Sequence, residues 1–204
     1  MRKNSPDLTY IVSAYNRPEL LPVCLWSIKA QSRQDFEVIV TDNATDQKIA
    51  AKHKSIVASI KDKRFKYVRT AGKIKVSDCF WAAEYAVKHH ARGRWYCFPC
   101  DDTYYAPEFA QRMLTAAYQN NWEFVLCGMP IVGPAAGGAA YRIWESPIHR
   151  SIKTAFIVKA SRFESFEAKP HKSMAANADY AFGCQMQRDG VRSGIVNEPM
   201  LFHN

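Results

Sequence analysis

The sequence predicts an α/β fold built on a largely parallel sheet, with helices covering both faces of that sheet. Segments rich in β-branched and aromatic residues alternate along the chain with segments whose apolar residues recur at helical spacing. The strand segments are apolar on both faces, which is typical of strands buried between two layers of helices. With 204 residues, of which 48% are hydrophobic and 23% charged, the chain suits one domain with a full core.

Each element is predicted from a local pattern. The first helix is expected to start at Asn16, a good N-cap, with Pro18 in its first turn. A proline also opens the helix that follows Ala106, and Gly190 ends the last helix. The predicted strands are 8–15, 36–42, 64–70, 94–100, 123–133, 151–160 and 191–201. The predicted helices are 16–28, 48–60, 77–90, 106–121 and 178–190.

The chain is strongly basic, and its charge suggests an anionic partner. The formal net charge is +9 and the isoelectric point is near 9.3, with the highest density of cations between Lys48 and Lys75. Such a surface attracts nucleic acid, anionic lipid headgroups or a diphosphate ligand, and charge alone does not choose among these or a solvated face. No apolar run reaches the roughly 18 residues that span a bilayer, and the N-terminus has no secretory h-region. We therefore expect a cytoplasmic protein, with peripheral contact to the inner face of a membrane.

Three polar clusters follow predicted strands directly: Ala14-Tyr15-Asn16, Asp42-Asn43 and Asp101-Asp102. Ligands of open α/β sheets bind beyond the carboxyl ends of the strands. The adjacent carboxylates of Asp101 and Asp102 would repel each other unless a cation or hydrogen-bond donors offset their charge. Oxygen ligands of this kind suit Mg²⁺ or Mn²⁺, whose shell is commonly completed by water and substrate phosphates. The alternatives are a solvated acidic turn at Asp101-Asp102 and ordinary turn chemistry around Asp42.

A C-x-x-C motif, Cys97-Phe98-Pro99-Cys100, immediately precedes the two acids. A redox motif of this form places its first thiol at a helix N-terminus, and a zinc site needs four ligands. Here the cysteines lie in or at the end of an apolar strand, and two acids follow them. We therefore expect Cys97 to pack in the core, and the six cysteines to be mainly buried free thiols.

Three blocks of the sequence are "LTYIVSAYNRPELLPVCLWSIKAQSRQDFEVIVTDNATD", "RGRWYCFPCDDTYYAPEF" and "NADYAFGCQMQRDGVRSGIVNEPMLFHN". Together they resemble the family 2 glycosyltransferases of the GT-A fold, in the family's order and over almost the whole chain. The resemblance implies a Rossmann-like, mixed and mostly parallel sheet. It also implies one domain, 1–204, with a nucleotide-binding half at 1–105 and an acceptor-binding half at 106–204. Pro99 and Ala178 stand where the family has acids.

The resemblance also implies roles for individual residues. The metal, Mn²⁺ or Mg²⁺, would be held by Asp102 and by His203, for which a surface histidine is the alternative. Asp179 would be the general base, for which a carboxylate favourable to a helix N-terminus is the alternative. The residues implied to bind the nucleotide are Thr9, Ala14, Tyr15 and Arg17 along the pocket, Asp42 at the base, Asp101 at the ribose and Lys73 (or Lys75) at the diphosphate.

The segment 133–150 is a connection rich in glycine and alanine that leads into aromatic residues, and it is a candidate acceptor site. Aromatic rings stack on sugars and acids bind hydroxyl groups, so Tyr141, Trp144 and Glu145 are the expected acceptor contacts. Core packing is the alternative for Trp144.

The resemblance implies an inverting, metal-dependent glycosyltransferase. A sugar would move from a nucleoside-diphosphate donor, with a UDP-sugar expected, to a hydroxyl of a glycan or lipid-linked acceptor in glycan or polysaccharide biosynthesis. Two alternatives remain: a catalytically degenerate nucleotide-binding domain, and a basic nucleic-acid-binding α/β protein. The second lacks support because the basic stretch Lys48–Lys63 has no interleaved aromatic residues for base stacking, so no nucleic-acid partner is expected.

Overall fold

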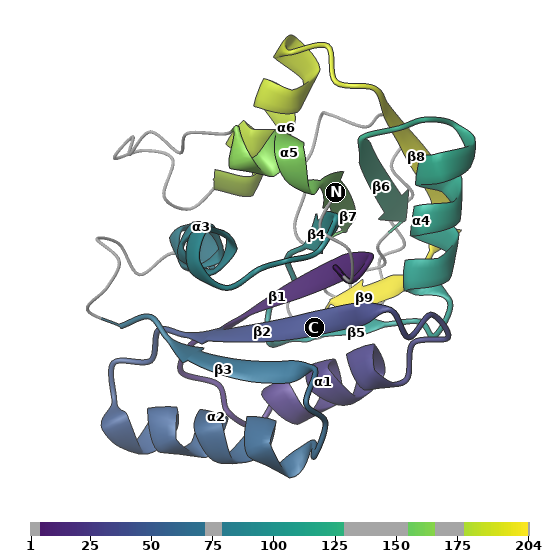
Figure 1. Ribbon diagram of the computed structural model, residues 1–204. Helices are drawn as coiled ribbons and strands as arrows, with labels where there is room; N and C mark the ends of the chain where they lie inside the picture. Colours follow the sequence, from purple (N-terminus) through teal and green to yellow (C-terminus); the bar gives the residue numbers. More distant parts are fainter. Residues whose placement is uncertain (1–4, 72–78, 129–154, 166–177, 204) are drawn as a thin grey trace, which may run out of the picture.

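The computed structural model describes residues 5–71, 79–128, 155–165 and 178–203 (Figure 1). The strands are β1 (Leu8–Ala14), β2 (Phe36–Asp42), β3 (Phe65–Arg69), β4 (Trp95–Cys97), β5 (Thr103–Tyr105), β6 (Phe124–Gly128), β7 (Phe156–Lys159), β8 (Ser193–Pro199) and β9 (Leu201–His203). The helices are α1 (Leu21–Lys29), α2 (Gln47–Ser59), α3 (Cys79–His89), α4 (Phe109–Gln119), α5 (Ala160–Glu164) and α6 (Ala178–Arg188).

Seven of these strands form one mixed sheet in the order β3-β2-β1-β4-β7-β6-β8. β1 is parallel to both β2 and β4, β2 is parallel to β3, and β6 is parallel to β8. Only β7 runs in reverse, because it pairs antiparallel with β4 on one side and with β6 on the other. The predicted mixed and mostly parallel sheet is therefore confirmed.

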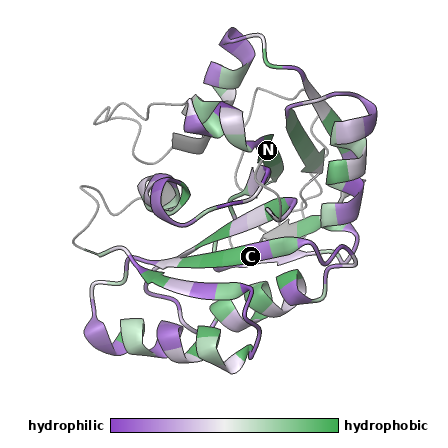
Figure 2. Ribbon diagram, in the orientation of Figure 1, coloured by the Kyte–Doolittle hydropathy of each residue, from purple (hydrophilic) through white to green (hydrophobic). Residues whose placement is uncertain are grey.

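Helices pack on both faces of the sheet, as the apolar strands predict. Along β1, Tyr10 and Val12 join a core with residues of α1, α2 and α4, whereas Ile11 joins a second core with residues of α3, α5 and α6. Figure 1 shows these two groups of helices on opposite sides of the sheet, and Figure 2 shows mostly apolar colour along β1 and β2. Since successive side chains of a strand point to opposite faces, both sets of β1 residues must be apolar or internally hydrogen-bonded.

The structure differs from the predicted elements in four places. The strand expected at 94–100 ends at Cys97, since Pro99 has no N–H to continue a ladder. The final predicted strand is divided into β8 and β9, and β9 forms an antiparallel ribbon with the unpredicted strand β5. The short helix α5 was also not predicted. α1 begins later than predicted, with Leu20 rather than Asn16 as its N-cap. Among the described helices, none is long and apolar enough to cross a bilayer.

We predict that Gly93→Ala destabilises the fold. A β-carbon at this position would lie 2.7 Å from the backbone nitrogen of Thr9, which cannot move without shifting β1. Overpacking of this kind costs about 1–3 kcal/mol. Urea unfolding should show that loss, while the control Lys52→Ala, on an exposed position of α2, should change stability by less than about 0.5 kcal/mol. Equal stabilities would contradict the close packing between Gly93 and β1.

Candidate functional site

The two acids after β4 reach the end of β1 through backbone pairing. Beyond Cys97 the chain continues alongside β1, where Ser13 N donates to Pro99 O at 2.9 Å. Asp101 N in turn donates to Ser13 O at 3.1 Å. Pro99 therefore fits here although it lacks an N–H, because the pairing uses its carbonyl oxygen. The result is that Asp101 and Asp102 leave the sheet beside the loop that follows β1.

Arg17 lies between these two carboxylates and binds both of them. Its Nη2 donates to Asp101 Oδ1 at 2.5 Å and its Nη1 to Asp102 Oδ2 at 2.6 Å. The backbone N–H of Tyr15 donates to the other oxygen of Asp101 at 3.3 Å. Burial raises the pKa of Asp101 above its ordinary value, although Arg17 and the Tyr15 N–H act in the opposite direction. Arg17 itself is 46% exposed, so one partly exposed cation bridges the two carboxylates beneath it.

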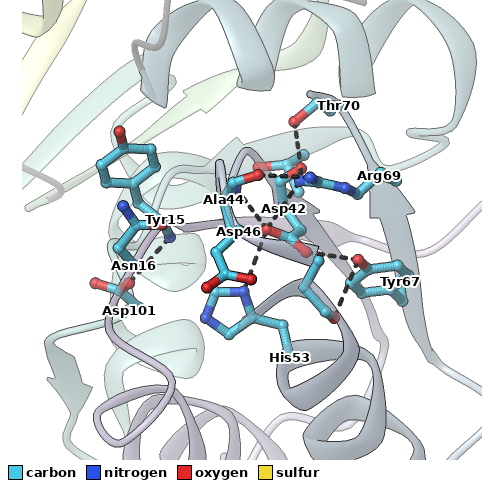
Figure 3. A network of polar contacts seen from close by, with 12 residues as sticks. Tyr15, Asn16, Asp42, Ala44, Asp46, His53, Tyr67, Arg69, Thr70 and Asp101 are labelled. Carbon is cyan, nitrogen blue, oxygen red and sulfur yellow. Dashed lines mark hydrogen bonds and ion pairs between the residues drawn. The ribbon is translucent and has the colours of Figure 1, made fainter. Parts of the chain in front are cut away.

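Asp42, at the end of β2, is enclosed by protein donors (Figure 3). Its Oδ1 accepts from Ala44 N at 2.8 Å, and its Oδ2 accepts from the Tyr67 hydroxyl at 2.5 Å. The side chains of His53 and Arg69 lie 3.2 and 3.4 Å from Oδ1. Although burial raises the pKa of Asp42, the contacts with His53 and Tyr67 and the Ala44 N–H outweigh it, and the pKa lies below its usual value. The carboxylate thus ties β2, β3 and α2 together, and its expected hydrogen bond to a nucleobase stays a prediction.

The structure brings together most of the predicted nucleotide-binding residues. Ala14 is in register with Asp42, because β1 and β2 are parallel, and Asn43 N donates to Ala14 O at 3.1 Å. Ala14, Tyr15, Arg17, Asp42 and Asp101 therefore share the carboxyl edge of the sheet, as the strand-end pattern predicts.

Thr9 is not brought to that edge. It lies five residues before Ala14 on β1, is fully buried, and donates through Oγ1 to Glu37 Oε1 at 3.0 Å. The same oxygen accepts from Gly93 N at 2.9 Å. Thr9 therefore supports packing near the opposite end of the strand, and the structure gives it no place in the nucleotide pocket.

Several of the other predicted site residues fall outside the described residues. They are Lys73 for the diphosphate and Tyr141, Trp144 and Glu145 for the acceptor. Asp179 lies in the first turn of α6 and His203 in β9, and in both cases only the backbone is described. In the β5–β9 ribbon His203 pairs with Thr103, the residue directly after Asp102. This register brings the backbone of His203 next to the acid predicted to bind the metal.

The donor atoms at this edge fit a hard divalent ion that is completed by a ligand. Within the described residues no group of three or more His, Cys, Asp or Glu side chains is arranged as a metal cage. Two adjacent carboxylates are present, however, and one guanidinium bridges both of them, so a single positive charge faces two negative charges. Mg²⁺ and Mn²⁺ commonly use one or two carboxylates and take their remaining ligands from water and phosphates. The set therefore matches a metal that arrives with a diphosphate, and Arg17 would have to release the acids.

The cysteines preceding the acids are not suited to redox chemistry. Cys97 is fully buried, and burial raises the pKa of its thiol to about 12, which disfavours the reactive thiolate. Its sulfur lies 3.5 Å from the hydroxyl of Tyr105. Cys24, Cys97 and Cys127 are buried and form no disulfide. The prediction that Cys97 packs in the core is confirmed.

Sequence reasoning missed the residues that surround Asp42. Arg69 ends β3 and donates to the carbonyl oxygens of Asp42 and Ala44 at 3.0 and 2.5 Å, so the strand-end argument applied to β3 would have found it. His53 follows Ala50 and precedes Val57 on the buried face of α2, where the helical period indicates an inward position. Tyr67 carries no comparable signal, since a tyrosine in a strand more often packs than binds a carboxylate.

We predict that Asp42→Asn lowers the free energy of unfolding by about 1–3 kcal/mol at neutral pH, because an amide cannot accept from all the donors that surround the carboxylate. The pKa of Asp42 is depressed in the folded state, so its contribution is complete above the ordinary value of 3.8 and is lost as pH falls through the folded value. Urea unfolding should therefore show a difference at pH 7 that shrinks on acidification below the ordinary pKa. The control is Asp189→Asn at an exposed acid; a difference that grows in acid would contradict this account.

Solved structures with the same fold are longer than this chain. Staphylococcus aureus TarS, residues 1–349 in complex with UDP, aligns with 17% identity and a TM-score of 0.73 over 96% of this chain and 60% of its own. The same TarS fragment in complex with UDP-GlcNAc aligns with 16% identity over 96% of this chain and 58% of its own, with the same TM-score.

A second protein shares this fold. A mannosyltransferase, PcManGT from Pyrobaculum calidifontis, in complex with GDP-Man and Mn²⁺, aligns with 18% identity and a TM-score of 0.73 over 98% of this chain and 57% of its own. The chain thus spans about 60% of the length of these structures, and the likeness shows the fold. No curated protein matches the chain. The family model described as Glycosyl transferase family 2 matches residues 9–177, well over half of the sequence. The chain therefore belongs to glycosyl transferase family 2.

Proposed function

We propose that this protein transfers a sugar from a nucleoside-diphosphate donor to a hydroxyl acceptor, and that the donor binds at the carboxyl edge of the sheet. The observation that carries the proposal is the meeting of Asp101, Asp102 and Arg17 where β1 and β4 end. Family membership and the nucleotide and nucleotide-sugar complexes of TarS and the mannosyltransferase support it. TarS was solved with UDP-GlcNAc and the mannosyltransferase with GDP-Man. We propose a UDP-sugar as the donor to test first.

In this proposal the residues of the edge divide the work. Asp101, held in place by the Tyr15 N–H, is positioned to meet the ribose. Asp102 and His203 would hold the divalent ion, which when bound supplies a Lewis acid for the charge that develops on the leaving diphosphate. Once released from the acids, Arg17 remains beside the same site and can bind a phosphate oxygen, a pairing for which a guanidinium is well suited.

The acceptor side of the proposal depends on Asp179. Transfer with inversion requires that the acceptor hydroxyl lose its proton as its oxygen attacks the sugar carbon from the side opposite the diphosphate. A carboxylate at the start of α6 would take that proton. We propose that residues 106–204 form the acceptor-binding half, with Tyr141, Trp144 and Glu145 as its sugar contacts. We also propose that the transfer serves glycan or polysaccharide biosynthesis.

We predict that Asp102→Ala removes metal-dependent nucleotide binding. The variant loses the carboxylate that would bind the ion, while Asp101 keeps its bonds to Arg17 and Tyr15. Titration calorimetry with UDP, and with GDP in parallel, should show Mn²⁺-dependent binding by the wild type that weakens at least tenfold in the variant. Asp189→Ala is the control, since it removes one exposed acid elsewhere. Affinity like that of the wild type in Asp102→Ala would refute the assignment of Asp102.

We predict that Asp179→Asn keeps nucleotide binding but loses turnover by roughly 10²–10⁴-fold, the usual contribution of general-base catalysis. Turnover would be followed as release of the free nucleoside diphosphate from the nucleotide sugar that binds. Unchanged turnover would remove Asp179 from this role. If the wild type binds nucleotide sugars and releases nothing with a panel of glycan acceptors, the degenerate nucleotide-binding alternative would stand instead.

A further inference from the structure

The amino-terminal edge of the sheet, opposite the candidate site, carries a row of cations above buried acids. Residues at this edge are joined by backbone hydrogen bonds that follow the strand order. Arg94 N donates to Pro6 O, Ala160 N to Arg94 O, and Glu123 N to Arg192 O. Each of these residues precedes a parallel strand or follows the reversed strand β7. We call the row the basic edge; its members are Arg33, Lys66, Arg92, Arg94, Lys159, Arg162 and Arg192, around Asp7, Glu37 and Glu123.

Each of the three carboxylates holds more than one cation. Asp7 pairs with Arg33 and Arg94, and Glu37 pairs with Lys66 at 3.3 Å and Arg92 at 2.9 Å. Glu123 faces Lys159, Arg162 and Arg192 at 3.2, 2.8 and 3.6 Å. The seven cations thus exceed the three carboxylates by four positive charges.

Burial separates the two signs of charge on this edge. The side chains of Asp7, Glu37 and Glu123 are only 3–8% exposed, whereas those of six of the cations are 41–55% exposed. Solvent therefore meets mainly guanidinium and ammonium groups, each oriented by an acid below it. Three exposed acids among the described residues lie around this edge: Asp35, Glu164 and Asp189. Three further exposed cations, Lys63, Lys88 and Arg188, offset their charge, so the excess of four positive charges remains.

The size and shape of the basic edge suit an extended anionic partner. Strands lie about 4.8 Å apart, so seven strands spread these cations over roughly 29 Å. A surface hollow of about 270 Å³ adjoins Arg92 and is lined by Lys63, Arg64, Lys66 and Arg92 together with Asp35 and Glu37. This hollow is large enough for a phosphate headgroup among four cations, and the row offers further cations on both sides of Arg94.

One exposed aromatic residue lies at this edge and favours lipid over nucleic acid. Tyr118 is 51% exposed; its hydroxyl donates to Asp7 at 3.3 Å and accepts from Trp95 Nε1 at 3.2 Å. An amphipathic ring beside cations is typical of residues at a membrane surface. Non-specific binding of single-stranded nucleic acid uses several aromatic platforms for successive bases, and Tyr118 is one ring, already packed at right angles against Trp95.

We propose that the basic edge docks this protein on an anionic lipid surface. Docking there turns the carboxyl edge, with Asp101 and Asp102, away from the bilayer, because the two edges are opposite ends of the same strands. The site would then receive its substrates from the aqueous side. The docking surface shares no residue with the candidate site, so its test stands or falls separately from the proposed transfer reaction.

The test is vesicle sedimentation with phosphatidylcholine alone and with phosphatidylcholine mixed with phosphatidylglycerol. We expect binding to the mixed vesicles only, weakening as salt rises. Each basic residue near an anionic surface contributes about fivefold to binding, so Arg92→Gln, Arg94→Gln and Arg192→Gln combined should lower the partition constant about a hundredfold. The matched control removes the same charge from exposed positions of α2, with Lys48→Gln, Lys52→Gln and Lys54→Gln, and should lose much less.

Two further variants keep the test decisive if the triple glutamine variant does not fold. Arg192→Gln alone leaves Lys159 and Arg162 on Glu123 and should reduce binding about fivefold. The triple replacement of the same arginines by lysine keeps the charge and should retain most of the binding. Equal binding to neutral and mixed vesicles would overturn the proposal, as would an α2 variant that loses as much as the edge variant. Binding to duplex DNA at physiological salt without binding to vesicles would assign the edge to nucleic acid and overturn it as well.

Discussion

The backbone pairing between the end of β1 and residues 99–101 is the interaction on which the candidate site depends. Two hydrogen bonds, from Ser13 N to Pro99 O and from Asp101 N to Ser13 O, extend the contact of β1 with β4 beyond the last regular pair. They fix where the chain turns out of the sheet, and so where both acids emerge. Without them Asp101 would not meet the Tyr15 N–H, and Arg17 could not bridge the two carboxylates. An unusual residue for this position, Pro99, is compatible because only its carbonyl takes part.

The charged residues then give the two edges of the sheet different patterns of charge. At the carboxyl edge two acids share one partly exposed guanidinium, an arrangement that an incoming cation can replace. At the amino edge the ratio is reversed, and each buried acid pairs with two or three cations, most of them exposed. Asp42 belongs to neither pattern, because its buried carboxylate accepts hydrogen bonds from Ala44 N and the Tyr67 hydroxyl and lies close to Arg69 and His53. Acidic side chains therefore occur in three settings in this protein. Their burial and the number of donors around each carboxylate distinguish these settings.

Much of the fold could be predicted from the sequence, because its signals are local. The apolar runs of β1 and β2 and the helical period of α4 are strong enough to place these elements near their observed bounds. The β5–β9 ribbon has no such signal, since its strands have three residues each and lie almost a hundred positions apart. The reversed direction of β7 is likewise not visible in the hydrophobic period of its sequence.

The site was predictable only in outline. That Ala14, Asp42 and Asp101 share one edge follows from parallel strands ending together, and the structure agrees. That Asp42 is enclosed by His53, Tyr67 and Arg69 depends on side chains from α2 and β3, which no single stretch of sequence reveals. Thr9 shows a second limit: it lies on β1, which leads to the site, but near the amino end of that strand, far from the carboxyl edge.

The most direct test of the account is a crystal structure of the protein with UDP and Mn²⁺. The account predicts the diphosphate at the ends of β1 and β4, the metal in contact with Asp102, and Arg17 released from both carboxylates. A nucleotide bound elsewhere would contradict it. So would a structure in which Arg17 still bridges Asp101 and Asp102 while the nucleotide is bound.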